Sequence, residues 1–106
     1  MCERDIKFAV GTYTVLGGEG VLIYSLNPRT LQTECLGRQR VENPSFLCAS
    51  PSGGHVYAVN ESGSRSGVHR LAVVENGALT ACQTVASCAD PSHILWLSTR
   101  TLCISN

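Results

Sequence analysis

His93 is the residue with the clearest chemical potential in this sequence, because it follows Asp90-Pro91-Ser92 and begins the apolar run Ile94 to Leu97. Imidazole titrates near neutral pH, so a histidine at the start of a strand can take a proton from attacking water or give one to a leaving group. The same side chain can equally be a hydrogen-bonded residue that ties one structural unit to the next. Its position alone leaves both interpretations open.

Three further polar residues, Asn60, Glu61 and Arg65, follow an apolar run that ends at Val59. A carboxylate can act as a base, an amide can orient a ligand, and a guanidinium group can hold an anion through two parallel hydrogen bonds. Asn and Glu at the end of a strand also commonly satisfy turn backbone or face water. Arg65 lies among serines and glycines, which is typical of a solvated arginine on a loop. Each of the three therefore has a structural alternative.

A predicted hairpin over residues 43–61 positions Asn60 and Glu61. Its two apolar runs, Phe46 to Ala49 and Val56 to Val59, flank the segment Ser50-Pro51-Ser52-Gly53-Gly54, whose proline and glycines favour a chain reversal. Similar β-prone runs predict strands over residues 6–10, 21–26, 31–41, 68–74 and 79–86, and a second hairpin over 92–106. No segment has the spacing of apolar residues that indicates a helix.

The second half of the chain repeats the first at a spacing of 47 residues. Three pairs of segments have this spacing: Gly20-Val21 with Gly67-Val68, Cys35 with Cys82, and Pro44-Ser45 with Pro91-Ser92. A repeat of this size, filled by four short strands, is typical of a β-propeller blade. We therefore predict an all-β fold: a β-propeller fragment made of four-stranded antiparallel blades.

The repeat also predicts how the partial propeller domain, residues 1–106, is divided. Residues 6–42 give the second to outer strands of one blade, 43–89 give one complete blade, and 90–106 give the inner and second strands of the next. Because a blade is stabilised by a neighbour on each side, we expect the chain to be part of a longer propeller.

Composition and charge argue against several other classes of protein. Eight basic and eight acidic residues cancel, and no run of like charge predicts a nucleic-acid partner. The charged amino terminus lacks the apolar region of a signal peptide, and no segment is long enough to span a membrane, so we expect a cytoplasmic protein with no membrane partner. The six cysteines lie within strand patterns without paired CxxC spacing, which favours reduced cysteines. We expect no metal and no cofactor.

Strand alternation predicts which loops share one end of a blade, because the connection into the inner strand and the connection from the second to the third strand open on the same side. That end gathers Tyr13, Asn43, Ser45, Asn60, Glu61, Asp90, Ser92, His93 and Asn106. The opposite end is expected to carry the Ser52-Gly53 and Asn76-Gly77 turns with His55 and Arg100. Asn43 and Asp90 both precede prolines, which favours a shared loop geometry over ligand contact.

Five segments of the chain, taken in order and spacing, resemble the seven-bladed lactonase family. They are Val10-Gly11-Thr12-Tyr13-Thr14, Gly20 to Leu26, Asn43 to Leu47, Tyr57 to Glu61, and Asp90 to His93. The resemblance implies a propeller of about 330 residues, of which this chain is the amino-terminal part. It also implies lactone hydrolysis, most directly of 6-phosphogluconolactone to 6-phosphogluconate in the pentose phosphate pathway of carbohydrate metabolism.

The resemblance implies a role for His93, and residue type and position indicate the roles of three other candidates. His93 matches the family's Pro-x-His motif and is the expected catalytic residue. The expected substrate-binding residues are Glu61 for sugar hydroxyls, Asn60 for the ring and Arg65 for the phosphate. The expected partners are a small-molecule sugar lactone and the remaining blades of the same propeller. Two alternatives stay open: a non-catalytic propeller that binds a partner or ligand on the same face, and an inactive truncated product.

Overall fold

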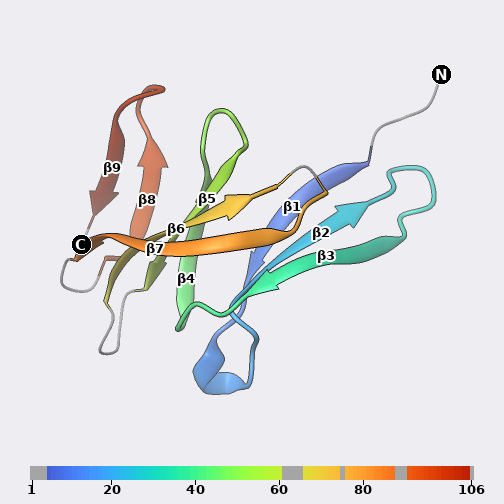
Figure 1. Ribbon diagram of the computed structural model, residues 1–106, viewed down its shortest axis with the longest axis horizontal. Coiled ribbons are helices and arrows are strands. Elements are labelled where there is room, and N and C mark those ends of the chain that lie inside the picture. Colours follow the sequence, from blue (N-terminus) through green and yellow to red (C-terminus); the bar gives the residue numbers. More distant parts are fainter. Residues whose placement is uncertain (1–4, 61–65, 75, 88–90, 106) are drawn as a thin grey trace.

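The computed structural model describes residues 5–60, 66–74, 76–87 and 91–105 (Figure 1). In this part of the chain there are nine strands and one short 3-10 turn. They are β1 (Ile6–Gly11), η1 (Thr14–Leu16), β2 (Val21–Leu26), β3 (Thr33–Gln39), β4 (Pro44–Ala49), β5 (His55–Asn60), β6 (Gly67–Val73), β7 (Leu79–Ser87), β8 (His93–Trp96) and β9 (Leu102–Ser105).

The strands form three antiparallel sheets in which each strand pairs with its neighbours in sequence. The sheet orders are β1-β2-β3, β4-β5-β6-β7 and β8-β9. Figure 1 shows the four-stranded sheet between the other two. The prediction of an all-β fold made of antiparallel propeller sheets is confirmed.

The central sheet contributes buried residues on both faces, because it lies between the other two sheets and successive side chains of a strand point to opposite sides. Along β5, Val56 and Ala58 pack towards β2, whereas Val59 packs towards β8. This explains why residues 56–59 read as a continuous apolar run rather than as alternating apolar and polar residues. The central sheet thus contributes to two separate hydrophobic clusters.

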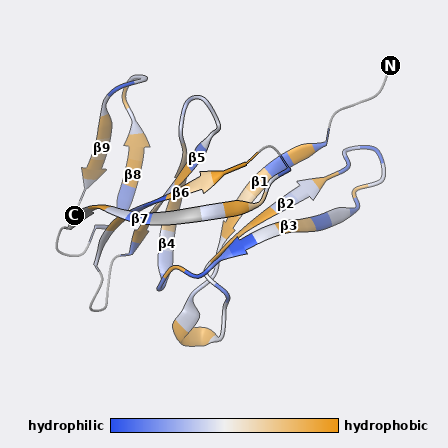
Figure 2. Ribbon diagram, in the orientation of Figure 1, coloured by the Kyte–Doolittle hydropathy of each residue, from blue (hydrophilic) through white to orange (hydrophobic). Residues whose placement is uncertain are grey.

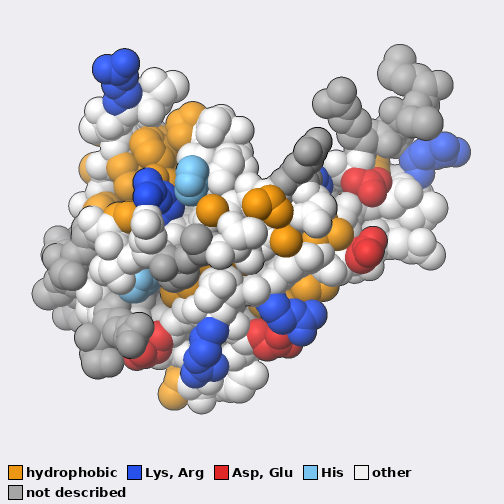
Figure 3. Space-filling model, viewed as in Figure 1, with side chains coloured by type: hydrophobic (Ala, Val, Ile, Leu, Met, Phe, Trp, Pro, Cys, Tyr) orange, Lys and Arg blue, Asp and Glu red, His pale blue; other side chains and the backbone are white. Residues whose placement is uncertain are grey.

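Each cluster fills the contact between two sheets. We call the contact between β1-β2-β3 and the central sheet the first seam; its buried residues are Val21, Ile23, Val41, Val56, Ala58 and Leu71. We call the contact between the central sheet and β8-β9 the second seam; its buried residues are Val59, Val68 and Ile94. Figure 2 shows the apolar stretches of β8 and β9, and Figure 3 shows hydrophobic side chains gathered at the same end of the molecule.

One predicted strand is too long. The sequence pattern predicted a strand from residue 31 to 41, but β3 begins at Thr33 because the preceding residues form a turn. Asn27 Oδ1 accepts hydrogen bonds from the backbone N–H groups of Arg29 (2.9 Å) and Thr30 (3.2 Å), and Leu31 has a φ of 61°. Side chains such as Asn compete for backbone groups in this way and favour turns over strands.

A serine forms the turn between β8 and β9, whose sequence, Leu97-Ser98-Thr99-Arg100-Thr101, contains no glycine. Ser98 Oγ accepts hydrogen bonds from the backbone N–H groups of Arg100 (3.2 Å) and Thr101 (3.1 Å). The Leu97 N–H donates to the Thr101 carbonyl at 2.8 Å and closes the hairpin. A hydroxyl can replace an Asx side chain in such turns, so the hairpin closes without Asn, Asp or Gly in this segment.

Candidate functional site

The strand registers bring several connections to one end of the three sheets, on the lower side of Figure 1. Gly11 pairs with Val21, Pro44 pairs with Asn60, and His93 pairs with Ser105. This end therefore carries the loop between β1 and β2, the entry into β4 and the entry into β8. His55 lies at the other end of β5 from Asn60.

His93 is the first residue of β8, and its side chain is exposed. Its ring meets the ring of Phe46 edge to face, with centroids 4.5 Å apart and an interplanar angle of 85°. Phe46 lies on β4, so the contact joins the entries of two neighbouring sheets. Such an arrangement limits the orientation of the imidazole while leaving it accessible to water, as proton transfer requires.

Asn60 is the last residue of β5 and has no exposed surface. It pairs with Pro44 on one side and with Gly67 on the other. A buried amide is expected to be hydrogen-bonded and to hold the backbone around it. Burial therefore favours the interpretation of Asn60 as a loop-fixing residue, and its predicted contact with substrate stays a prediction. The predicted residues Glu61 and Arg65 lie outside the described residues.

Asn43 joins the entry of β4 to the turn η1. Its Oδ1 accepts hydrogen bonds from Thr14 Oγ1 at 3.1 Å and from the Val15 N–H at 3.0 Å. In return, the Asn43 N–H donates to Thr14 Oγ1 at 3.2 Å. Asn43 has a φ of 42°, a left-handed conformation that asparagine adopts more readily than most residues. The loop geometry expected of this Asn-Pro pair therefore includes a direct bond to the neighbouring sheet.

The loop from Thr12 to Gly20 is closed at its base by a reciprocal pair of hydrogen bonds. Thr12 Oγ1 donates to the Gly20 carbonyl at 2.8 Å and accepts from the Gly20 N–H at 3.0 Å. Within the loop, the N–H groups of Leu16 and Gly18 both donate to the Tyr13 carbonyl. These bonds satisfy the loop's own backbone, so the loop keeps its shape without needing contacts to other elements.

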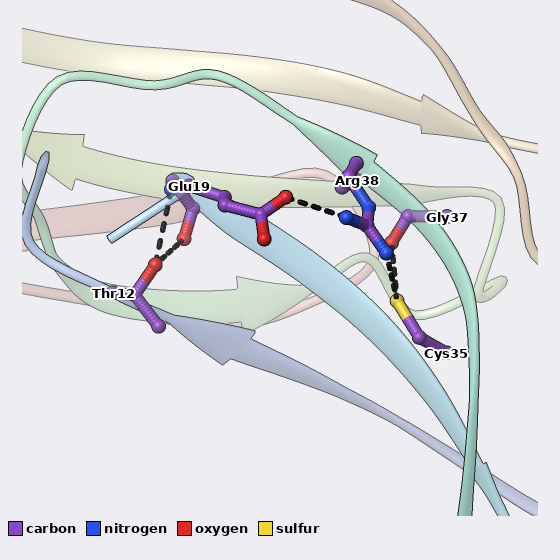
Figure 4. A network of polar contacts seen from close by, with 6 residues as sticks. Thr12, Glu19, Cys35, Gly37 and Arg38 are labelled. Carbon is purple, nitrogen blue, oxygen red and sulfur yellow. Dashed lines mark hydrogen bonds and ion pairs between the residues drawn. The ribbon is translucent and has the colours of Figure 1, made fainter. Parts of the chain in front are cut away.

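An ion pair links the same loop to β3 (Figure 4). Arg38 Nη1 lies 2.7 Å from Glu19 Oε2, and Arg38 Nη2 donates to the sulfur of Cys35 at 3.6 Å. The Cys35 contact and the Glu19 carboxylate raise the pKa of Arg38, so the guanidinium group stays charged. Both partners of the ion pair are largely exposed, so water screens their attraction and the pair adds little to stability.

Sequence reasoning did not single out Thr14 or Phe46. Phe46 carried a signal in the repeat, because it lies 47 residues before His93 and thus occupies the equivalent place one sheet earlier. Thr14 carried none, since a contact with a residue 29 positions away depends on how two sheets pack. Its discovery needed the structure.

The described residues show no further elements of a site. No helix in this part of the chain is long and apolar enough to cross a membrane. No group of three or more His, Cys, Asp or Glu side chains, among the residues described, is arranged to hold a metal ion. Three cysteines in the described segments, Cys35, Cys48 and Cys103, are free thiols.

The comparison with protein families gives a match over residues 7–106 to the model described as "Lactonase, 7-bladed beta-propeller". The chain belongs to this family. A search of curated protein sequences found no match. The family assignment therefore rests on the family model and on solved structures.

Two crystal structures resemble this lactonase-family chain over most of its length. A candidate 6-phosphogluconolactonase from Bacteroides uniformis is 31% identical, with a TM-score of 0.79 over 90% of this chain. A candidate 6-phosphogluconolactonase from Bacteroides fragilis is 30% identical, with a TM-score of 0.78 over 94% of this chain. The match covers 29% of each of those proteins, so the chain spans less than a third of their length.

Proposed function

We propose that this chain is part of a lactone hydrolase that opens 6-phosphogluconolactone to 6-phosphogluconate. The observation that carries the proposal is His93, an exposed imidazole at the entry of β8, held edge to face by Phe46. The family match and the two similar structures support the reaction class. The corresponding physiological setting is the pentose phosphate pathway in the cytoplasm.

The reaction needs one proton acceptor that later becomes a proton donor. In the proposed mechanism, His93 takes a proton from water while the water oxygen attacks the lactone carbonyl carbon. The resulting tetrahedral intermediate collapses, the bond between that carbon and the ring oxygen breaks, and the ring oxygen receives the proton from His93. The products are a carboxylic acid and a hydroxyl group on one open chain, which together account for the lactone and one water molecule.

Substrate binding is proposed to involve residues of several blades. Within this chain, Glu61 is the proposed partner of the sugar, and the buried Asn60 is proposed to fix the loop that follows it. Arg65 is the proposed partner of the phosphate, because guanidinium groups bind phosphate through two parallel hydrogen bonds. Further anchors would come from the blades that complete the ring. We accordingly keep the division proposed from the repeat: a partial blade over residues 6–42, a complete blade over 43–89 and a partial blade over 90–106.

The test compares two histidine variants in the full-length protein that carries this sequence. We expect His93→Gln to lower kcat for 6-phosphogluconolactone by about 10²- to 10⁴-fold, the usual contribution of a general acid–base residue. His55→Gln is the matched control, because His55 begins β5 and so lies at the end of the central sheet opposite to the candidate site. Rates are corrected for spontaneous ring opening. An unchanged rate in His93→Gln would remove His93 from the mechanism.

A second candidate function, partner binding on the same face, is favoured by the apolar tip of η1. Val15 is 74% exposed and Leu16 is 82% exposed, and Figure 2 colours this turn as hydrophobic. Exposed apolar side chains that lie together can mark a protein contact. The assay of the unsubstituted protein separates the two functions: a rate no faster than spontaneous hydrolysis would leave partner binding as the better candidate.

A further inference from the structure

Asn43 makes the side-chain hydrogen bonds that join the entry of β4 to the turn η1. The carboxamide oxygen receives two donors, Thr14 Oγ1 and the Val15 N–H, and the Asn43 backbone N–H returns a bond to Thr14. Three bonds between one residue and two successive residues of a turn fix both the position and the rotation of that turn. A single bond would fix only a distance.

The loop that receives these bonds has little freedom of its own. It is closed at Thr12 and Gly20 and braced inside by the Tyr13 carbonyl. The loop therefore moves relative to the central sheet as one rigid unit. The bonds to Asn43 oppose that movement at the tip, while the exposed pair between Glu19 and Arg38 acts from the side of β3.

The segment that begins at Asn43 also reaches the candidate catalytic histidine. Pro44 packs against the end of β1 so closely that a Cβ on Gly11 would lie 3.0 Å from the Pro44 carbonyl oxygen. Phe46, two residues further along β4, holds the ring of His93. The entry of β4 thus contacts the loop of one neighbouring sheet and the histidine of the other.

We propose that Asn43 is a positioning residue for the lactonase site: it sets the loop from Thr12 to Gly20 against the entry of β4, and thereby sets the site wall relative to His93. The inference rests on the proposed function, since it assigns the loop to the wall of that site. Small displacements of positioning groups can lower a rate by up to about a hundredfold, so the loss of the hydrogen bonds between Asn43 and η1 should lower kcat measurably.

Three variants separate the side-chain bonds from the backbone conformation. Asn43→Gly tolerates the positive φ but removes the acceptor, whereas Asn43→Asp keeps an oxygen in the same place and also tolerates this conformation. Asn27→Gly is the matched control, because Asn27 Oδ1 likewise accepts two hydrogen bonds, from Arg29 and Thr30, in a turn at the other end of the sheets. Each variant is made in the full-length protein.

Two measurements are made on each variant: hydrogen exchange of the Val15 amide by NMR, and kcat and KM for 6-phosphogluconolactone. We expect Asn43→Gly to speed Val15 exchange at least about tenfold and to lower kcat about tenfold, because the turn loses its acceptor. We expect Asn43→Asp to restore both values to within about threefold. Asn27→Gly should change neither, whatever it does to the unfolding midpoint.

The outcomes distinguish this inference from the proposed function. If Asn43→Gly leaves Val15 exchange unchanged, or loses no more activity than Asn27→Gly, the positioning role is wrong even though the protein is a lactonase. If the unsubstituted protein opens no lactone, the proposed function and the kinetic part of this inference both fail. Val15 exchange then still decides whether Asn43 holds the turn.

Discussion

The two seams of this molecule differ in both composition and geometry. The first seam buries six residues, all aliphatic, and is bridged at its end by Asn43. The second seam buries three and adds two edge-to-face aromatic contacts, Phe46 with His93 and Tyr57 with Trp96. The first seam is therefore an aliphatic core, whereas the second leaves the imidazole ring of His93 accessible at its edge.

The second seam also contains an imperfection that the first does not show. Trp96 Nε1 is buried without a hydrogen-bond partner in the described part of the chain. A buried donor left unsatisfied costs about 1–3 kcal/mol. We therefore expect the second seam to be the weaker of the two.

The largest expected effect is the loss of a buried leucine from the first seam. Leu71 has no exposed surface and lies between two sheets, so Leu71→Ala leaves a cavity that neither sheet can readily fill. We expect a loss of about 3–5 kcal/mol in the free energy of unfolding. Ile94→Ala in the second seam should cost about 2–3 kcal/mol, because the β8-β9 hairpin can move inwards. Urea unfolding followed by circular dichroism measures both.

Equal losses in these two variants would contradict the comparison, since they would show that the second seam is packed as tightly as the first. A change in the denaturant slope would indicate a different denatured or native state. The comparison is therefore drawn from variants whose slopes agree.

A smaller effect is expected from the turn between β6 and β7, which packs on the first seam. Gly77 has a φ of 89°, and a Cβ there would lie 2.5 Å from Leu36 Cδ1 and 2.9 Å from Leu36 Cβ. We expect Gly77→Ala to cost about 2–3 kcal/mol, from left-handed strain and the clash together. Gly53→Ala is the control, with a φ of 80° and open space around it, and should cost only about 1–2 kcal/mol.

The difference between the two glycine variants measures how closely the turn approaches β3. If thermal or urea unfolding gives the same loss for both, then Leu36 moves aside at no cost and the first seam is looser at this edge than its aliphatic core indicates. If Gly77→Ala costs more, the tight packing of the first seam extends to its outer turn.

Much of the fold could be predicted because its determinants are local. Val21–Leu26 is recovered with the predicted bounds, and the central sheet contains the strands expected from its apolar runs. The repeat also predicted that His93 would lie at the same end as Asn43, because strand alternation fixes which loops share an end. The sequence predicts a turn over Asn27 to Thr30 and a more polar strand from Leu31, but the Leu31 N–H donates to the Asn27 carbonyl at 2.7 Å and the turn extends through Leu31.

The contacts of the candidate site could not be predicted, because they join residues distant in sequence. The bonds from Thr14 and Val15 to Asn43 depend on how two sheets meet. The contact of Phe46 with His93 depends on the angle between the central sheet and β8-β9. Strand periodicity determines which face of a sheet a side chain occupies and at which end a loop lies. It does not determine how neighbouring sheets are placed relative to each other.

The smallest expected effect concerns Cys48, whose thiol lies against the second seam. Partial burial raises its pKa above the ordinary value of 9.0, and a hydrogen bond with the Trp96 backbone opposes that shift. Because the thiolate is the reactive form, we expect iodoacetamide at pH 8 to alkylate Cys48 about three- to tenfold more slowly than the exposed Cys103. Mass spectrometry of digested protein measures the two rates.

The same shift predicts how stability depends on pH. The folded chain holds the Cys48 proton more tightly than the unfolded chain, so its contribution is complete below the ordinary thiol pKa and is lost as pH rises through the raised one. Cys48→Ser should therefore lose less of its free energy of unfolding at alkaline pH than the unsubstituted protein.

Ile94→Ala, which opens the second seam, should speed Cys48 alkylation towards the Cys103 rate, while Leu71→Ala in the first seam should not. If both core variants speed it equally, the two seams do not open independently, and the contrast between them is one of composition alone.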